Sequence, residues 1–166
     1  MKIKTVWLLS ILIFLLLISL VFFLFNNISS LDVKICKELS KDGVNCNEIV
    51  FIDNNNDLVF FKDENNLRYA KVNDELSLVK VGTGILDLNE FPPDDPLLWK
   101  ASDTLLWGLS TEEVQSILIT GDNDMQPNKI RYQGVWLWYH AYDDEVKLPV
   151  LLNAYDKDGI LIYGKE

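Results

Sequence analysis

The sequence predicts an α+β fold in which an N-terminal transmembrane helix is followed by one mainly antiparallel β domain with short helices. One observation behind this prediction is an uncharged, apolar segment near the N-terminus. Another is a series of short apolar runs separated by turns rich in Asn and Asp. The expected parts are a cytoplasmic N-terminus (1–5), a transmembrane helix (6–25), a juxtamembrane helix and linker (26–47) and an extracytoplasmic β-rich domain (48–166).

The N-terminal segment has the length and composition of a membrane span. From Val6 to Phe25 it carries no charge, and only Ser10 and Ser19 are polar. A helix of that length measures about 30 Å, the thickness of the hydrocarbon core of a bilayer. Lys2 and Lys4 precede the segment, so the positive-inside rule places the N-terminus in the cytoplasm. We therefore expect a single-pass protein of the cell membrane with its C-terminal domain outside.

A cleaved signal peptide is the alternative to this anchor. Signal peptides have an apolar region of roughly 7–15 residues followed by a small-x-small cleavage site. Here the apolar region is longer, and cleavage after Ser30 would place the bulky Ile28 where a small side chain is required. An uncleaved anchor therefore fits the sequence better than a secreted form.

The short helix and the first strands are expected directly after this segment. Ser30 can cap a helix in which Leu31, Ile35 and Leu39 share one face, and Gly43 can end it. The strands that follow are separated by Asn- and Asp-rich clusters that favour tight turns, which predicts an antiparallel meander. These four strands are expected at residues 48–52, 58–62, 67–72 and 76–81.

The second half of the domain is expected to mix helical turns with strands. Residues 97–99 and 105–107 read as short helical turns ending at Gly108. Ser110 and Glu113 form a capping box, which predicts a short helix leading into residues 117–120. Later strands are expected at about 128–133, 135–142, 149–155 and 160–163, with Asp158-Gly159 as the turn of the last hairpin.

Two cysteines lie in the outer part of the chain. An even number in an oxidising compartment predicts one disulfide, between Cys36 and Cys46. Closing a loop of this size contributes about 2–3 kcal/mol in the chain-entropy model. Two reduced thiols are the alternative.

The charge balance restricts the partners of this domain. Lys2 and Lys4 are the only charged residues before Asp32, so the outer part holds 13 basic and 25 acidic residues and a net charge of −12. Recognition of phosphate backbones relies on clusters of Lys and Arg. We therefore expect no nucleic-acid partner, whereas a cationic partner or divalent cations are compatible with this charge.

Residues 135–142 form an aromatic strand that is apolar on both faces. Such a strand normally lies inside a sheet with each face covered, so we expect it to belong mainly to the core. Alternate residues point to opposite faces, and one face is richer in side chains with hydrogen-bonding tips. This face is the candidate binding surface and consists of Trp136, Trp138, His140 and Tyr142.

The sequence predicts no catalytic residue, no metal ligand and no cofactor. His140 is the only histidine and has no nucleophile motif near it, so a catalytic triad has no clear basis. Asp53, Asn55 and Asp57 have the spacing of a calcium loop, but Leu58 occupies the position that needs glycine.

Two segments carry a resemblance to known proteins. The first is residues 106–110 (LWGLS) with Glu113-Val114; the second is residues 148–150 (LPV) with residues 154–159 (AYDKDG). In this C-terminal part, the chain resembles a loose group of small membrane-anchored or secreted extracytoplasmic proteins of Bacillus-like bacteria. The resemblance implies an extracytoplasmic β-rich domain and assigns no catalytic residue.

The function expected from these observations is a non-enzymatic binding or interaction module attached to the membrane through residues 6–25. Its partner would be an envelope protein, a peptide or a wall glycan. One alternative is a hydrolase-type enzyme that uses His140 with Asp143 or Asp144. Another is a regulator that senses the envelope.

Overall fold

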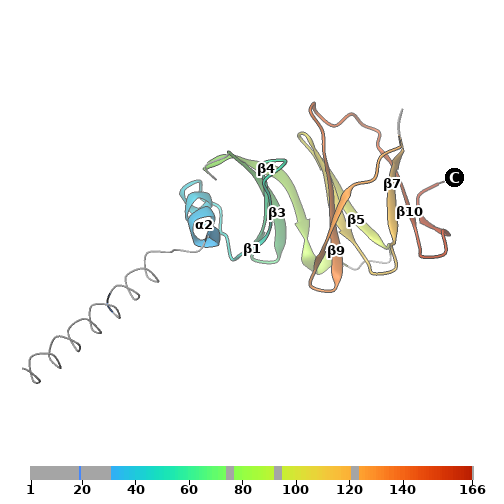
Figure 1. The fold of residues 1–166 in the computed structure, drawn as a ribbon, viewed down its shortest axis with the longest axis horizontal. Coiled ribbons are helices and arrows are strands. Elements are labelled where there is room, and N and C mark those ends of the chain that lie inside the picture. Colours follow the sequence, from blue (N-terminus) through green and yellow to red (C-terminus); the bar gives the residue numbers. More distant parts are fainter. Residues whose placement is uncertain (1–18, 20–30, 74–76, 92–94, 121–123, 166) are drawn as a thin grey trace, which may run out of the picture.

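The computed structural model describes residue 19 and residues 31–73, 77–91, 95–120 and 124–165. Within these ranges the chain is almost entirely antiparallel β structure, with one α-helix, α2 (Leu31–Lys41), and a single 3-10 turn, η1 (Leu88–Glu90) (Figure 1). The predicted α+β class is therefore wrong. The strands are β1 (Glu48–Asp53), β2 (Leu58–Asp63), β3 (Asn66–Val72), β4 (Leu78–Asp87), β5 (Leu97–Ser102), β6 (Leu105–Ser110), β7 (Ser116–Thr120), β8 (Asn128–Tyr132), β9 (Val135–Ala141), β10 (Leu151–Tyr155) and β11 (Leu161–Tyr163).

The predicted transmembrane helix finds no support in the structure. Among the described residues, no helix combines the length and the hydropathy that crossing a membrane requires. The segment from Val6 to Phe25 lies outside the described residues except for Ser19.

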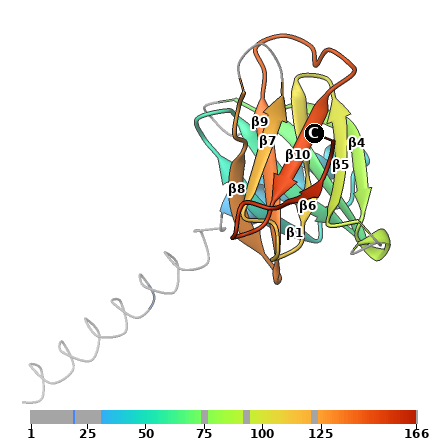
Figure 2. The same cartoon turned by 90° about the vertical axis from the view of Figure 1, so that its right-hand side faces the viewer.

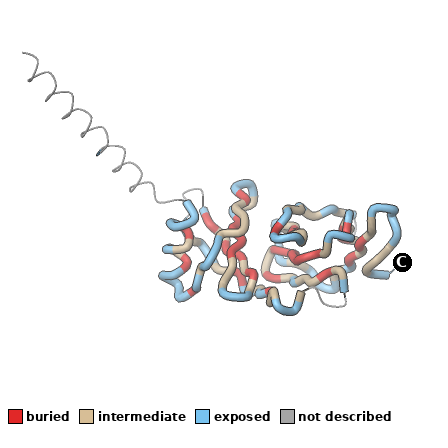
Figure 3. Tube along the Cα trace, turned by 90° about the horizontal axis from the view of Figure 1, so that it is seen from below, coloured by how far each residue is buried: buried red, intermediate tan, exposed pale blue. Residues whose placement is uncertain are grey.

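The described elements stack in four layers. Helix α2 covers a first sheet of order β1-β2-β3-β4, which packs on a central sheet of order β5-β6-β9-β8. A third sheet of order β11-β10-β7 covers the other face of the central sheet (Figure 2). Seen from below, buried segments run through the layers and exposed segments mark the turns and the outer surfaces (Figure 3). The central sheet is thus covered on both faces.

The first sheet is the antiparallel meander that the sequence predicts. Its strands pair in chain order, and β2 is buried at four consecutive positions because its two faces meet different layers. Leu58 and Phe60 face the central sheet, whereas Val59 and Phe61 face α2. The last strand differs from the predicted range of 76–81, because β4 continues to Asp87.

Helix α2 packs on the outer face of this sheet, as its apolar positions predict. Ile35 and Leu39 are fully buried there, whereas Leu31, the third residue of the predicted face, is exposed. The helix ends in a Schellman motif, in which the Val44 amide donates to the Leu39 carbonyl at 3.2 Å and Gly43 has a φ of 74°. The predicted disulfide between Cys36 and Cys46 is present and joins the helix to the segment before β1.

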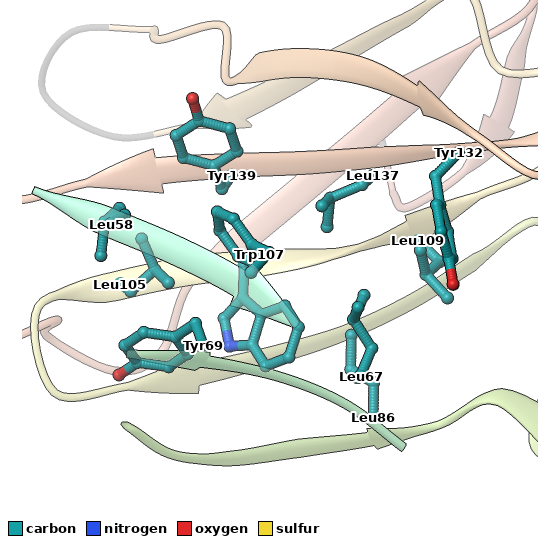
Figure 4. Packing of buried hydrophobic residues seen from close by; sticks show 11 residues of the cluster. Leu58, Leu67, Tyr69, Leu86, Leu105, Trp107, Leu109, Tyr132, Leu137 and Tyr139 are labelled. Atoms are coloured by element: carbon teal, nitrogen blue, oxygen red, sulfur yellow. The ribbon is translucent and has the colours of Figure 1, made fainter. Parts of the chain in front are cut away.

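An aromatic core joins the first sheet to the central sheet. The ring centroid of Trp107 lies 5.8 Å from that of Phe60 and 5.6 Å from that of Tyr69. The ring centroids of Phe60 and Tyr139 are 5.0 Å apart. Figure 4 shows Trp107 in the middle of this cluster, among residues contributed by both sheets. A second core, containing Trp138, fills the space between the central sheet and the third sheet.

The helical turns predicted at residues 97–99 and 105–107 are strands instead. They belong to β5 and β6, which pair with each other, and β6 also pairs with β9. All six residues of β6 are buried because it is an inner strand covered on both faces. No helix follows Ser110 either, because the chain makes only a turn there before β7 begins. The last hairpin is confirmed, with Gly159 at a φ of 77° in its turn.

Candidate functional site

The structure separates the four residues of the candidate binding face. Trp138 is 0% exposed and belongs to the core beneath the third sheet. Trp136 is half-buried, with Lys129 Nζ 4.6 Å and Arg131 Cζ 5.3 Å from its ring centroid. These two cations lie over the indole, so Trp136 is already in contact with groups of its own sheet.

His140 and Tyr142 lie together at the far end of β9. Their rings meet edge to face with centroids 4.6 Å apart, and both residues are half-buried. Burial lowers the pKa of His140 and raises the pKa of Tyr142. At neutral pH both side chains are therefore uncharged, and they form an amphipathic pair at the end of the strand.

A cleft of about 490 Å³ begins beside Tyr142, between the central sheet and the third sheet. We call it the acidic cleft. Its lining comes from the end of β7, from Met125 and from the connection between β9 and β10. Its lining residues are Ile119, Thr120, Met125, Tyr142, Asp143, Asp144, Glu145, Val146, Lys147, Pro149 and Val150.

Backbone hydrogen bonds hold the walls of the acidic cleft. The Tyr142 amide donates to the Thr104 carbonyl at 2.8 Å, and the Val146 amide donates to the Asp103 carbonyl at 2.9 Å. The connection from β9 to β10 is therefore attached to the turn between β5 and β6. On the opposite wall, Ile119 and Met125 exchange two backbone hydrogen bonds. Each wall is thus anchored at defined points by backbone hydrogen bonds.

The acidic cleft combines an apolar floor with negative charge. Ile119, Met125 and Val150 pack against the core between the central and third sheets. Asp143, Asp144 and Glu145 are exposed at its edge, and within the described ranges none of the three belongs to an ion pair. Carboxylates without a cationic partner beside apolar surface attract a ligand that has both a positive charge and an apolar part.

The arrangement gives no support to the predicted catalytic alternative. Among the described residues, no hydrogen bond joins His140 to Asp143, Asp144 or any other carboxylate, and its ring packs against that of Tyr142. A histidine base needs a partner that orients its ring. The described residues also contain no group of three or more His, Cys, Asp or Glu side chains placed to hold a metal ion.

Sequence reasoning missed most of the acidic cleft. Tyr142 is the one residue of the predicted face that lines it, whereas Ile119 and Met125 come from a distant segment. The only local signal is the acidic run at residues 143–145 directly after an aromatic strand. No protein-family model, curated protein or solved structure matches this chain. The resemblance of the C-terminal segments to small membrane-anchored or secreted extracytoplasmic proteins therefore remains a prediction.

Proposed function

We propose that this protein is a non-enzymatic binding module that works outside the cytoplasm and holds a basic segment of a partner protein or peptide in the acidic cleft. The observation that carries the proposal is that carboxylates which form no ion pair within the described ranges lie beside an apolar floor next to Tyr142. A bound lysine or arginine could place its charge at the carboxylates and its methylene groups on the floor.

Two further properties agree with this function. The disulfide between Cys36 and Cys46 is consistent with an oxidising compartment, which lies outside the cytoplasm in most cells. The net charge of −10 draws basic ligands toward the protein and increases their association rate at low ionic strength.

Charge reversal at the edge of the acidic cleft tests the proposal. The probe is a fluorescein-labelled peptide of alternating lysine and leucine, and its binding to the full-length chain is followed by fluorescence anisotropy. We expect the double variant Asp143→Lys/Asp144→Lys to weaken binding about tenfold or more, because two attractive charges become repulsive. The effect should shrink as salt is added, because ions screen exposed charges.

A matched variant separates the acidic cleft from overall charge. Asp42→Lys/Glu90→Lys makes the same change in net charge at two exposed positions that do not line the cleft. This variant should retain most of the affinity. Equal weakening by both double variants would mean that net charge alone attracts the peptide, and the acidic cleft would not be the binding site.

The chemistry of the probe provides a second control. A peptide with glutamate in place of lysine should not bind, and a wall glycan fragment should not displace the basic peptide. Displacement by the glycan would instead favour a sugar-binding module.

The proposed compartment is tested by adding protease to intact cells, since a domain outside the cytoplasm is cleaved and one inside is protected.

A further inference from the structure

Two lysines lie directly opposite each other on neighbouring strands of the first sheet. Lys71 on β3 and Lys80 on β4 are paired in the β ladder. Like charges at directly opposed positions destabilise a sheet, so this pair needs a compensating interaction. Both side chains point toward the central sheet, because each bonds the turn between β5 and β6.

The contacts of the two lysines compensate only part of their charge. Lys80 Nζ lies 2.9 Å from Asp103 Oδ1, and this ion pair lowers the pKa of Asp103, so the carboxylate is charged. Lys71 is half-buried, and its Nζ donates to the Thr104 hydroxyl at 2.7 Å. Among the described residues no carboxylate forms an ion pair with Lys71. An ammonium group has three donors, so each lysine retains two that these contacts do not use.

A pocket of about 330 Å³ opens at these donors. Its inner wall is Tyr69, which is 1% exposed and lies so close over Gly82 that a β-carbon there would be 2.2 Å from the ring. Burial and the nearby Asp103 raise the pKa of Tyr69 to about 12, so the hydroxyl keeps its proton. The residues that line the pocket are Tyr69, Lys71, Lys80, Gly82, Asp103, Thr104 and Glu145.

We propose that this pocket is a second binding site, which takes a small oxyanion: the carboxylate or phosphate group of a small solute. An oxyanion between the two ammonium groups would accept charge-assisted hydrogen bonds from donors of Lys71 and Lys80 that the described contacts do not use, and it would relieve their mutual repulsion. Within the described part of the chain Lys71 forms no ion pair, although its charge also contributes to the lowered pKa of Asp103. One carboxylate therefore lies beside two ammonium groups, which distinguishes this pocket from an ordinary surface salt bridge.

Glu145 limits the affinity of the oxyanion site. Its carboxylate lines both this pocket and the acidic cleft, so it repels an anion in the first and attracts a cation in the second. The two sites therefore share one wall but select opposite charges. The oxyanion site does not depend on the function proposed for the acidic cleft.

Thermal unfolding of the full-length chain tests the oxyanion site. Inorganic phosphate and acetate are added separately, with chloride keeping the ionic strength constant. A ligand that binds only the folded state raises the Tm with its concentration. We expect phosphate, acetate or both to raise the Tm of the wild type in a saturable way. Lys71→Gln should increase the apparent Kd about tenfold or more, because one charge-assisted hydrogen bond is lost.

Two variants complete the design. Lys100→Gln removes an exposed lysine of β5 that lies outside the pocket, and it should behave as the wild type does. Glu145→Gln should lower the apparent Kd for the oxyanion several-fold while it weakens the binding of the basic peptide. Because Glu145→Gln changes the two affinities in opposite directions, its effect on each ligand tests each site separately. This test also works if Lys71→Gln does not fold.

The relative response of the two probes identifies the ligand class. A larger response to phosphate indicates a phosphate group, and a larger response to acetate indicates a carboxylate. Phosphate also stabilises proteins generally by exclusion from their surface, which affects all variants alike. A Tm rise of equal size in the wild type, Lys71→Gln and Glu145→Gln would therefore overturn the proposal, as would the absence of any rise.

Discussion

The Tyr139 hydroxyl donates a hydrogen bond of 2.6 Å to Asp53 Oδ2 and so joins β9 of the central sheet to β1 of the first sheet. Asp53 also accepts hydrogen bonds from the Asn55 amide at 2.9 Å and from Asn56 Nδ2 at 2.6 Å. Burial raises the pKa of Asp53, but the hydrogen bonds from Tyr139, Asn56 and Asn55 outweigh burial and hold the pKa below its usual 3.8. A buried carboxylate thus fastens two sheets together in its charged form.

This carboxylate makes the stability of the fold depend on pH in the acid range. Because the folded state has the lower pKa, the unfolded state binds more protons as the pH falls. The stabilisation is therefore fully present above pH 3.8 and is lost at lower pH. We expect Tyr139→Phe to reduce the free energy of unfolding by about 1–2 kcal/mol at pH 7 and to flatten the decline below pH 4.

Urea unfolding at pH 7 and pH 3 measures both effects. Tyr155→Phe is the matched control, because Tyr155 is half-buried and makes no hydrogen bond through its hydroxyl within the described residues. A loss of equal size at the two pH values would show that the Tyr139 hydroxyl stabilises the protein independently of the charge on Asp53.

The two tryptophans of β9 should differ strongly in their contribution to stability. Trp138→Ala removes a fully buried indole and should lower the free energy of unfolding by about 3–5 kcal/mol. Trp136→Ala removes a half-buried ring and its contact with Lys129, so we expect a loss of about 1 kcal/mol. Thermal melts followed by circular dichroism separate the two. Similar losses would contradict the covering of β9 by the third sheet.

Reduction of the disulfide should weaken the attachment of α2. Cys36→Ser/Cys46→Ser should lower the free energy of unfolding by about 2–3 kcal/mol, because the unfolded chain regains the freedom that the loop removes. Dithiothreitol should have the same effect on the wild type and none on the double variant. If the wild type does not respond to dithiothreitol, the cysteines are not paired in the isolated protein.

Two positions require glycine for different reasons: Gly108 has no space for a side chain, and Gly159 has a positive φ. Gly108→Ala would place a β-carbon 2.3 Å from the Leu98 carbonyl oxygen and 2.8 Å from Trp138, so we expect a loss of about 3 kcal/mol or more. At Gly159 nothing lies within 4 Å, but the φ of 77° is unfavourable for alanine. Gly159→Ala should therefore cost only about 1 kcal/mol. Chemical denaturation of both variants gives the comparison.

The elements that the sequence predicted correctly are those whose signals are local. The apolar face of residues 31–41 and the glycine after it are sufficient to predict α2 and its end. Polar turns between short apolar runs predict the first sheet, because strands joined by tight turns can only pair with each other. The pairing of Cys36 with Cys46 needs only their proximity along the chain.

The elements that the sequence predicted wrongly depend on partners far away along the chain. β6 is buried at every position because β5 and β9 flank it and sheets cover both its faces. Its short apolar run has no period that distinguishes strand from helix. The capping box at Ser110 failed as a helix signal because the chain continues into β7, which pairs with β10 from a much later part of the sequence. Long-range pairing outweighed the local preference in both places.

The chain itself thus determined the short-range features: the helix at residues 31–41, a meander, a crosslink, a dominant negative charge and an aromatic strand that is apolar on both faces. Only tertiary structure decided that the third sheet buries Trp138 and leaves Tyr142 beside a cleft, and that Lys71 and Lys80 face the turn at Asp103. The physical reason is that exposure and electrostatic environment depend on which layers pack on a strand, and in this protein those layers come from segments far apart in the sequence.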